Sequence, residues 1–102
     1  MSVETKMSND NMTFTISVTG DFCFPVLHDF RNAYGSNEAS SAKNIIVDMR
    51  MTNTVDSSAL GMLLNMKEHF NKEDGEIHII NCNKFVGNIF EITNFKKKFS
   101  ID

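Results

Sequence analysis

Two linked segments decide the fold of this chain: NIIVDMR at residues 44–50, followed after a short loop by VDSSALGML at residues 55–63. Ile45, Ile46 and Val47 form a continuous β-branched run, typical of a strand that is covered on both faces in a parallel sheet. Beyond the loop, apolar residues recur at i, i+4, i+7 and i+11, which predicts an amphipathic helix. Its apolar stripe is Ala59, Leu63, Met66 and Phe70, flanked by Leu60, Leu64 and Met62, with Asn65, Glu68 and His69 opposite.

Asp56, Ser57 and Ser58 stand between this strand and this helix, and all three are residue types that cap helix N-termini. A full capping box is absent, because neither Glu nor Gln follows three residues after either serine. If Ser57 is the cap, Ser57→Ala should cost about 1 kcal/mol and Ser58 is left free for another role. Two hydroxyls at the positive end of a helix dipole are the best candidates for chemistry here, although plain capping is the commoner use.

Strand and helix periodicities recur along the rest of the chain. Alternation predicts a strand over Thr13–Thr19, and a short apolar run predicts a strand over Ile77–Ile80. The weakly patterned segment before them could add an edge strand over Ser2–Lys6. Helical spacing predicts one helix from Phe24-Pro25 to Tyr34 and another over Phe85–Ile92.

The segments between these elements carry turn residues. We expect Ser36–Lys43 to be a surface loop, and Gly20, Gly35, Asp74-Gly75 and Asn94 to end elements or form turns. Phe95, Phe99 and Ile101 predict a tail that folds back onto the core. The order of elements predicts an α/β sandwich, a mixed sheet of about four to five strands with helices packed on it, as a single domain over residues 1–102.

Composition narrows the function classes. With 102 residues, 41% hydrophobic and 23% charged, the sequence is that of one globular domain. The net charge of −3 and a single short basic run at residues 96–98 give no reason to expect nucleic-acid binding. No segment is long and apolar enough to span a bilayer or to serve as a signal peptide, so we expect no membrane insertion and a cytoplasmic location. Cys23 and Cys82 are then expected to be reduced, buried thiols.

The motifs of common enzymes are absent. The chain has no phosphate-binding glycine loop and no nucleophile elbow, and His69 lies about three helical turns from Ser58, too far to act as its base. His28 and His78 could approach Ser58 only through the fold. No metal-ligand spacing is present, so we expect neither an enzyme nor a cofactor or metal site.

The two segments together resemble the STAS domain of anti-sigma factor antagonists, in which a hydrophobic strand ending in Asp leads into an Asp-Ser-Ser-Gly-Leu or Asp-Ser-Thr-Gly-Leu helix start. Gly20-Asp21-Phe22 resembles the family's Gly-Glu-Leu-Asp turn, and Thr93-Asn94-Phe95 is similar to its closing Ser/Thr-Gly-Leu segment. The resemblance covers nearly the whole chain in order.

The resemblance implies a switch protein. Its partners would be a serine kinase of the histidine-kinase-like ATPase fold, which doubles as an anti-sigma factor, and a PP2C-type phosphatase that reverses the phosphorylation. By position the phosphorylated residue would be Ser58, with Ser57 as the second choice. The implied partner-binding residues are Asp21, Asp56, Ser57, Ser58, Ala59, Gly61, Met62 and Asn65. The alternative is a STAS scaffold subunit of a signalling or transport complex that is not phosphorylated.

Two positions depart from the family pattern. Ala59 replaces the glycine after the paired serines, and as a better helix former it should still permit a helical first turn. Cys23 replaces the acid that closes the Gly-Glu-Leu-Asp turn, leaving Asp21 as the acid of that turn. Met62 is expected either at the edge of the core or in an interface.

Overall fold

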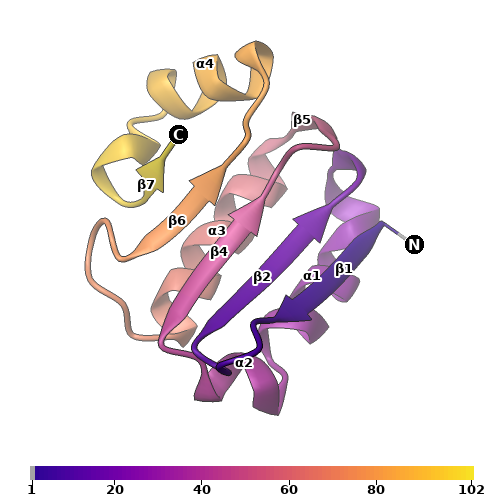
Figure 1. Cartoon of the computed structure of the whole chain (residues 1–102). Coiled ribbons are helices and arrows are strands. Elements are labelled where there is room, and N and C mark those ends of the chain that lie inside the picture. The colour runs from indigo at the N-terminus through magenta and orange to yellow at the C-terminus, as the bar shows by residue number, and fades with distance from the viewer. Residues whose placement is uncertain (1) are drawn as a thin grey trace.

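The computed structural model describes residues 2–102 and contains a five-stranded sheet in the order β1-β2-β4-β6-β7 (Figure 1). The antiparallel edge strand β1 pairs with β2, and all other neighbours are parallel. The strands are β1 (Val3–Met7), β2 (Thr13–Val18), β4 (Asn44–Asp48), β6 (Ile77–Ile80) and β7 (Ser100–Ile101). The predicted mixed α/β sheet is confirmed.

A small parallel pair, β3 (Gly20–Phe22) and β5 (Thr52–Val55), extends from the main sheet. The helices are α1 (Leu27–Tyr34), α2 (Asn37–Ser41), α3 (Ser57–His69) and α4 (Lys84–Ile92), with 3₁₀ turns η1 (Phe24–Val26) and η2 (Phe95–Lys97). Figure 1 shows α1 and α3 side by side behind the main sheet, which makes the architecture a two-layer sandwich.

The core lies between this helical layer and one face of the sheet. Strand pairing aligns Phe14, Ile45 and Ile77 in one buried row. A second buried row consists of Ile16, Val47 and Ile79. The predicted stripe of α3 supplies the buried Ala59, Leu63 and Met66, while α1 supplies Phe30 and Tyr34. Burial of these side chains is the main force that holds α3 on β4.

The prediction that the central strand is covered on both faces was wrong. Ile46 is only half-buried and pairs with the exposed His78 on the face that α1 and α3 leave open. Both helices lie on the opposite face, so every second residue of β4 contacts the core.

The segment Ser36–Lys43 is not a plain loop, because α2 occupies its centre. The Ser36 side chain accepts a hydrogen bond from the Ala39 N–H at 3.2 Å, which caps this one-turn helix, and Ala39 is fully buried. A five-residue helix with one buried residue is too short to show a period. The short strands β3, β5 and β7 were also not predicted. The turn predictions at Gly20, Gly75 and Asn94 are confirmed, since all three have positive φ.

The buried Thr52 on β5 yields a stability prediction. It is 2% exposed, and its Oγ1 donates to the Val18 carbonyl at 2.6 Å, which ties the small strand pair to the main sheet. Thr52→Val keeps the shape but removes the donor, so the free energy of unfolding should fall by about 1–3 kcal/mol in urea denaturation. Thr54→Val on the same strand, at a half-buried position, is the matched control and should change it by less than about 0.5 kcal/mol.

Candidate functional site

The start of α3 lies where the small strand pair ends. Asp56 follows β5 directly, and its backbone N–H donates to the Phe22 carbonyl at the end of β3 at 3.2 Å. The first turn of α3 is therefore fixed relative to β3 as well as to β5. This places Asp56, Ser57 and Ser58 beside the Gly20–Phe22 segment.

Asp56, not Ser57, is the N-cap of α3. Its backbone is extended (φ −108°, ψ 179°), and its Oδ1 accepts a hydrogen bond from the Ala59 N–H at 2.8 Å. The same oxygen accepts a hydrogen bond from the Ser58 Oγ at 2.7 Å. The sequence left open that Ser57 is the cap. Ser57 is instead the first helical residue, and Asp56 accepts the hydrogen bond from the Ala59 amide that a cap must provide.

These hydrogen bonds set the protonation of the cap. The Ser58 hydroxyl, and after it the Ala59 amide, lower the pKa of the Asp56 carboxyl below its ordinary value of 3.8. The carboxylate is therefore charged at neutral pH and complements the positive end of the helix dipole.

The two serines differ in their surroundings. Ser57 is exposed, and its side chain makes no hydrogen bond to any residue in the described part of the chain. Ser58 is half-buried, and its hydroxyl is held by the Asp56 carboxylate. Ser58 thus has a fixed, partly accessible oxygen.

The exposed side of α3 continues from this turn. Ser57, Gly61 and Asn65 are all exposed at i, i+4 and i+8, whereas Ala59 is buried and belongs to the core. A Cβ added at Gly61 would meet nothing within 4 Å, so the helix backbone is open to the surface there. Met62 is half-buried, and its Sδ accepts a hydrogen bond from the Tyr34 hydroxyl of α1 at 3.5 Å, which places it at the edge of the core.

The turn after β3 shows what the Cys23 departure does. Cys23 is the N-cap of η1, and its side chain makes no capping bond; its Sγ donates to the Asp21 carbonyl at 3.5 Å. Asp21 is exposed and pairs in register with Thr54 of β5. The acid that remains in this turn therefore faces solvent near the start of α3.

Phe24 is a surface residue of this site that the sequence analysis missed. Its side chain is 75% exposed, and its backbone amide contributes to the low pKa of Asp56. Sequence reasoning assigned Phe24 only to a helix start ahead of Pro25. An exposed phenylalanine can be recognised only once the packing is known.

No enzymatic constellation accompanies Ser58 in residues 2–102. Its hydrogen-bond partner is Asp56, while His28 contacts Asn32, His69 packs against Tyr34 and His78 lies on the open face of the sheet. The described residues contain no group of three or more His, Cys, Asp or Glu arranged to hold a metal ion. Cys23 and Cys82 are free and half-buried, and burial, followed by the nearby Asp102 charge, raises the pKa of Cys82 to about 11.

Comparison with known proteins identifies the family of this chain. A sequence model of the STAS domain family matches residues 3–102. The chain belongs to the STAS domain family. A STAS-domain-containing protein of Pseudomonas aeruginosa is 38% identical over 101 residues, spanning 99% of both chains. An anti-sigma-B factor antagonist of Staphylococcus aureus is 20% identical over 96 residues, spanning 94% of this chain and 89% of the relative.

Solved structures show the same STAS fold. The anti-sigma factor antagonist SpoIIAA in its unphosphorylated form superposes with a TM-score of 0.78 at 16% identity, covering 98% of this chain and 87% of that chain. The Bacillus cell fate determinant SpoIIAA in its phosphorylated form superposes with a TM-score of 0.71 at 15% identity, covering 98% and 90%. Among the helices described here, none combines the length and the hydrophobicity needed to cross a membrane.

The cap assignment makes a stability prediction. Asp56→Ala should lower the free energy of unfolding at neutral pH by about 0.5–2 kcal/mol, because the Ala59 amide loses its acceptor. Ser57→Ala, one residue along and without a capping bond, is the matched control and should change it by less than about 0.5 kcal/mol. Urea denaturation of both variants checks the assignment, and a larger loss for Ser57→Ala would contradict it.

The charge on Asp56 adds a pH dependence to the same comparison. Because its folded pKa lies below its ordinary value of 3.8, its charge stabilises the fold above that pH. This stabilisation is lost as the pH falls below 3.8 and through the folded pKa. The stability difference between the natural chain and Asp56→Asn should therefore shrink over that range.

Proposed function

We propose that this STAS protein is a phosphorylation-gated partner switch that binds a serine kinase of the histidine-kinase-like ATPase fold. The kinase transfers phosphate to Ser58, and a PP2C-type phosphatase removes it. The observation that carries the proposal is the Ser58 hydroxyl itself: half-buried, on the first turn of α3, and hydrogen-bonded at 2.7 Å to the Asp56 carboxylate.

Asp56 would position Ser58 for phosphoryl transfer. Because the hydroxyl hydrogen points at Asp56 Oδ1, the oxygen lone pairs are directed away from the carboxylate. A fixed nucleophile reduces the ordering that the kinase must impose. Ser57 has no such contact, so the geometry favours Ser58 as the modified residue.

Phosphate at Ser58 would change the surface and leave the fold intact. The phosphoryl group adds a charge of about −1.5 to −2 and replaces the hydrogen that bonds to Asp56. The free amides at a helix N-terminus can accept that charge. A partner closed over the same turn would instead have to bury a phosphate beside a carboxylate, which weakens binding.

The docking surface would extend along the exposed side of α3. Gly61 lets a partner approach the helix backbone closely, and Asn65 offers an amide one turn further on. Asp21 and Phe24 lie beside the first turn and would add a charge and an apolar contact. Exposed aromatic side chains are common anchors in protein interfaces.

The relatives support this proposal without extending to its details. The Staphylococcus aureus relative is named an anti-sigma-B factor antagonist, and SpoIIAA has been solved both with and without phosphate. Cys23 supports the alternative, an unphosphorylated scaffold, if a kinase requires an acid at that position. Mass spectrometry of protein isolated from its native cells separates the two, since phosphoserine is expected only in the switch.

The switch predicts opposite effects of two Ser58 variants. Ser58→Asp should leave the unfolding midpoint nearly unchanged, because a carboxylate in the first helical turn is compatible with the dipole. It should weaken kinase binding at least about tenfold, a change of about 1.4 kcal/mol. Ser58→Ala should keep the binding of the unphosphorylated chain. Titration calorimetry against the purified kinase measures both.

Ser57→Asp is the matched control, because it adds the same charge one residue earlier. A merely electrostatic effect of the helix start would weaken binding equally in Ser57→Asp and Ser58→Asp. Equal binding of the kinase by Ser58→Asp and Ser58→Ala would overturn the assignment of the switch to Ser58.

Gly61 separates binding from stability. Gly61→Ala should raise the free energy of unfolding by up to about 1 kcal/mol, because alanine is the better helix former and its Cβ meets nothing within 4 Å. The same methyl group should weaken kinase binding where the partner contacts the backbone. Gly87→Ala on α4, which has equal free space, is the control with unchanged binding. Unchanged binding by Gly61→Ala would place the interface elsewhere.

A further inference from the structure

The edge strand β1 has one side without a partner in the described chain. β1 pairs only with β2, so its other side carries unpaired backbone groups. The Thr19 N–H donates to the Ser2 carbonyl at 2.7 Å, and the Ser8 N–H donates to the Thr13 carbonyl at 2.9 Å. Since antiparallel ladders alternate, the amides of Glu4 and Lys6 also face β2.

The amides and carbonyls of Val3, Thr5 and Met7 therefore face outward. Every second residue of β1 thus offers its backbone amide and carbonyl outward, and such a row of unpaired groups can template a second strand. The outward side is also accessible. A groove of about 740 Å³ runs beside it, lined by Val3 and Thr5 of β1 and by Asp29, Asn32 and Ala33 of α1.

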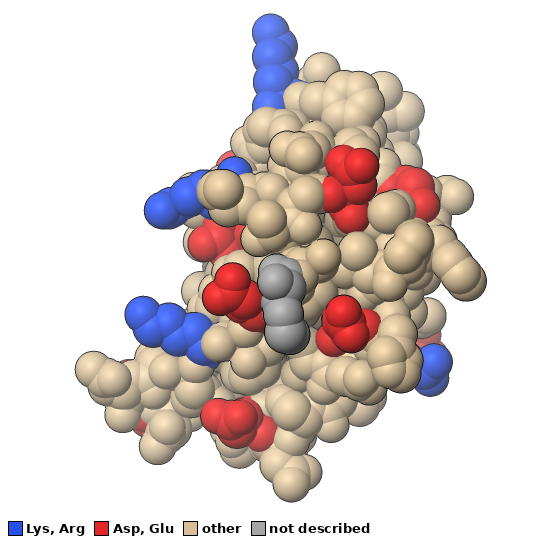
Figure 2. Space-filling model, turned by 90° about the vertical axis from the view of Figure 1, so that its right-hand side faces the viewer, with Lys and Arg blue, Asp and Glu red and all other residues tan. Residues whose placement is uncertain are grey.

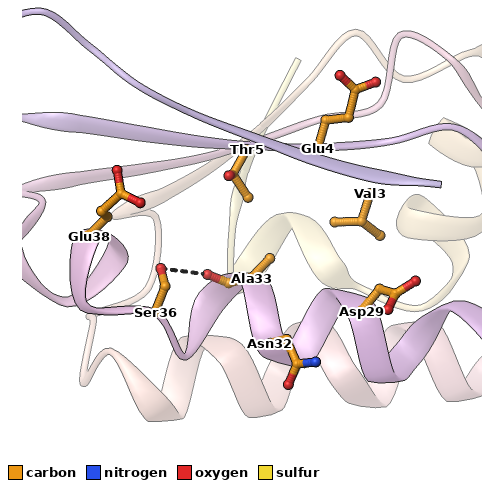
Figure 3. Close-up of a pocket in the computed structure, with 8 residues that line it drawn as sticks. All are labelled: Val3, Glu4, Thr5, Asp29, Asn32, Ala33, Ser36 and Glu38. Carbon is orange, nitrogen blue, oxygen red and sulfur yellow. Dashed lines mark hydrogen bonds between the residues drawn. The ribbon is translucent and has the colours of Figure 1, made fainter. Parts of the chain in front are cut away.

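Figure 3 shows how the side chains of β1 are divided. Val3 and Thr5 project toward α1 and the groove, whereas Glu4, which also lines the groove, projects to the side of the strand away from α1. Lys6 lies on the same side as Glu4, because alternate residues share a face. Figure 2 shows the molecule from this side, with acidic side chains across the face and basic ones at its margins.

The sequence of β1 is complementary to itself when reversed. It reads Val-Glu-Thr-Lys-Met, with an apolar residue at each end, one acid, one base and a central threonine. We propose that β1 pairs antiparallel with β1 of a second copy of this chain, with Thr5 opposite Thr5 on the two-fold axis. Glu4 of each copy then lies opposite Lys6 of the other, and Val3 lies opposite Met7.

This register is the one that charge allows. A shift of the axis to residue 4 would place Glu4 opposite Glu4, and a shift to residue 6 would place Lys6 opposite Lys6. Parallel pairing in register would place Glu4 opposite Glu4 and Lys6 opposite Lys6. Opposite charges and Thr–Thr pairs across strands are favourable, whereas like charges directly opposite are not. Glu4 and Lys6 form no ion pair within residues 2–102, so both are free to pair with a second copy.

The charges of β1 differ from those of a protected edge. Natural edges block association with charged side chains, proline or bulges. Here an acid and a base two residues apart favour antiparallel self-pairing instead of opposing it. Besides Glu4, the groove is lined by the acids Asp29 and Glu38. These two acids repeat across the two-fold axis and limit the affinity, so we expect a reversible dimer.

Analytical ultracentrifugation of the full chain from micromolar to millimolar concentration tests the proposal. The natural chain should show a reversible monomer–dimer equilibrium. Glu4→Lys and Lys6→Glu should each weaken the dimer at least about tenfold, because each replaces two attractive cross-strand pairs by two repulsive ones. Glu73→Lys, an equal charge change at an exposed turn, is the control and should dimerise like the natural chain.

Two further samples distinguish self-pairing from a general charge effect. The double variant Glu4→Lys/Lys6→Glu should dimerise again, because the charges are exchanged on both copies. A mixture of the two single variants should form a heterodimer more tightly than either single variant dimerises alone.

Backbone pairing is tested with proline. Thr5→Pro removes an outward N–H, so it should abolish the dimer while keeping the natural unfolding midpoint. Lys6→Pro instead removes an N–H that bonds to β2, so it should lower the unfolding midpoint. A natural chain that stays monomeric throughout would overturn the proposal. So would a double variant that does not recover dimerisation. If the natural chain stays monomeric, a basic extended segment of another protein becomes the better occupant of this edge, beside the groove acids Asp29 and Glu38. Neither outcome bears on the Ser58 switch, which uses a different surface.

Discussion

The burial of β4 between β2 and β6 is the constraint on which the rest of the structure depends. Its two inward residues, Ile45 and Val47, align with buried residues on both neighbouring strands, so a one-residue slip would expose both rows at once. Because β2, β4 and β6 run parallel, their carboxyl ends lie at the same end of the sheet. The small strand pair and the start of α3 lie at that end of the sheet, and this placement fixes the position of Ser58.

At the start of α3 one carboxylate serves two purposes. Asp56 Oδ1 completes the helix by accepting the Ala59 amide, and the same atom holds the Ser58 hydroxyl. Phosphorylation of Ser58 would remove the second bond and leave the first, because the Ala59 amide belongs to the backbone. The helix can then keep its cap while its surface changes charge, which is what a switch that does not unfold requires.

Local pattern predicted the parts of this structure that depend on periodicity. The apolar stripe of α3, the alternation of β2 and the left-handed turn at Asn94 are all legible in the sequence, since each reflects a repeat or a single residue's backbone preference. The strands β3, β5 and β7 were not predicted, because they are two to four residues long and form only through pairing with distant segments. Ser57 was taken as a possible cap because three capping residues stand in a row; backbone dihedrals, which fix the cap at Asp56, are not encoded by residue type alone. The exposure of Phe24 likewise depends on what packs beside it, and no local signal reports that.

The two proposed surfaces lie on different elements, and this separation has a consequence. Pairing through β1 uses the free edge of the sheet, whereas the switch uses the first turn of α3 beyond the carboxyl ends of β2 and β4 (Figure 1). A dimer formed through β1 would therefore leave both Ser58 residues accessible and present them on one particle. A kinase that is itself dimeric would bind such a particle at two points, so the second contact forms at the effective concentration set by the first. Phosphorylation of one Ser58 would then lower affinity by removing the double attachment as well as the local contact. The response to phosphate would be steeper in the dimer than in a single domain.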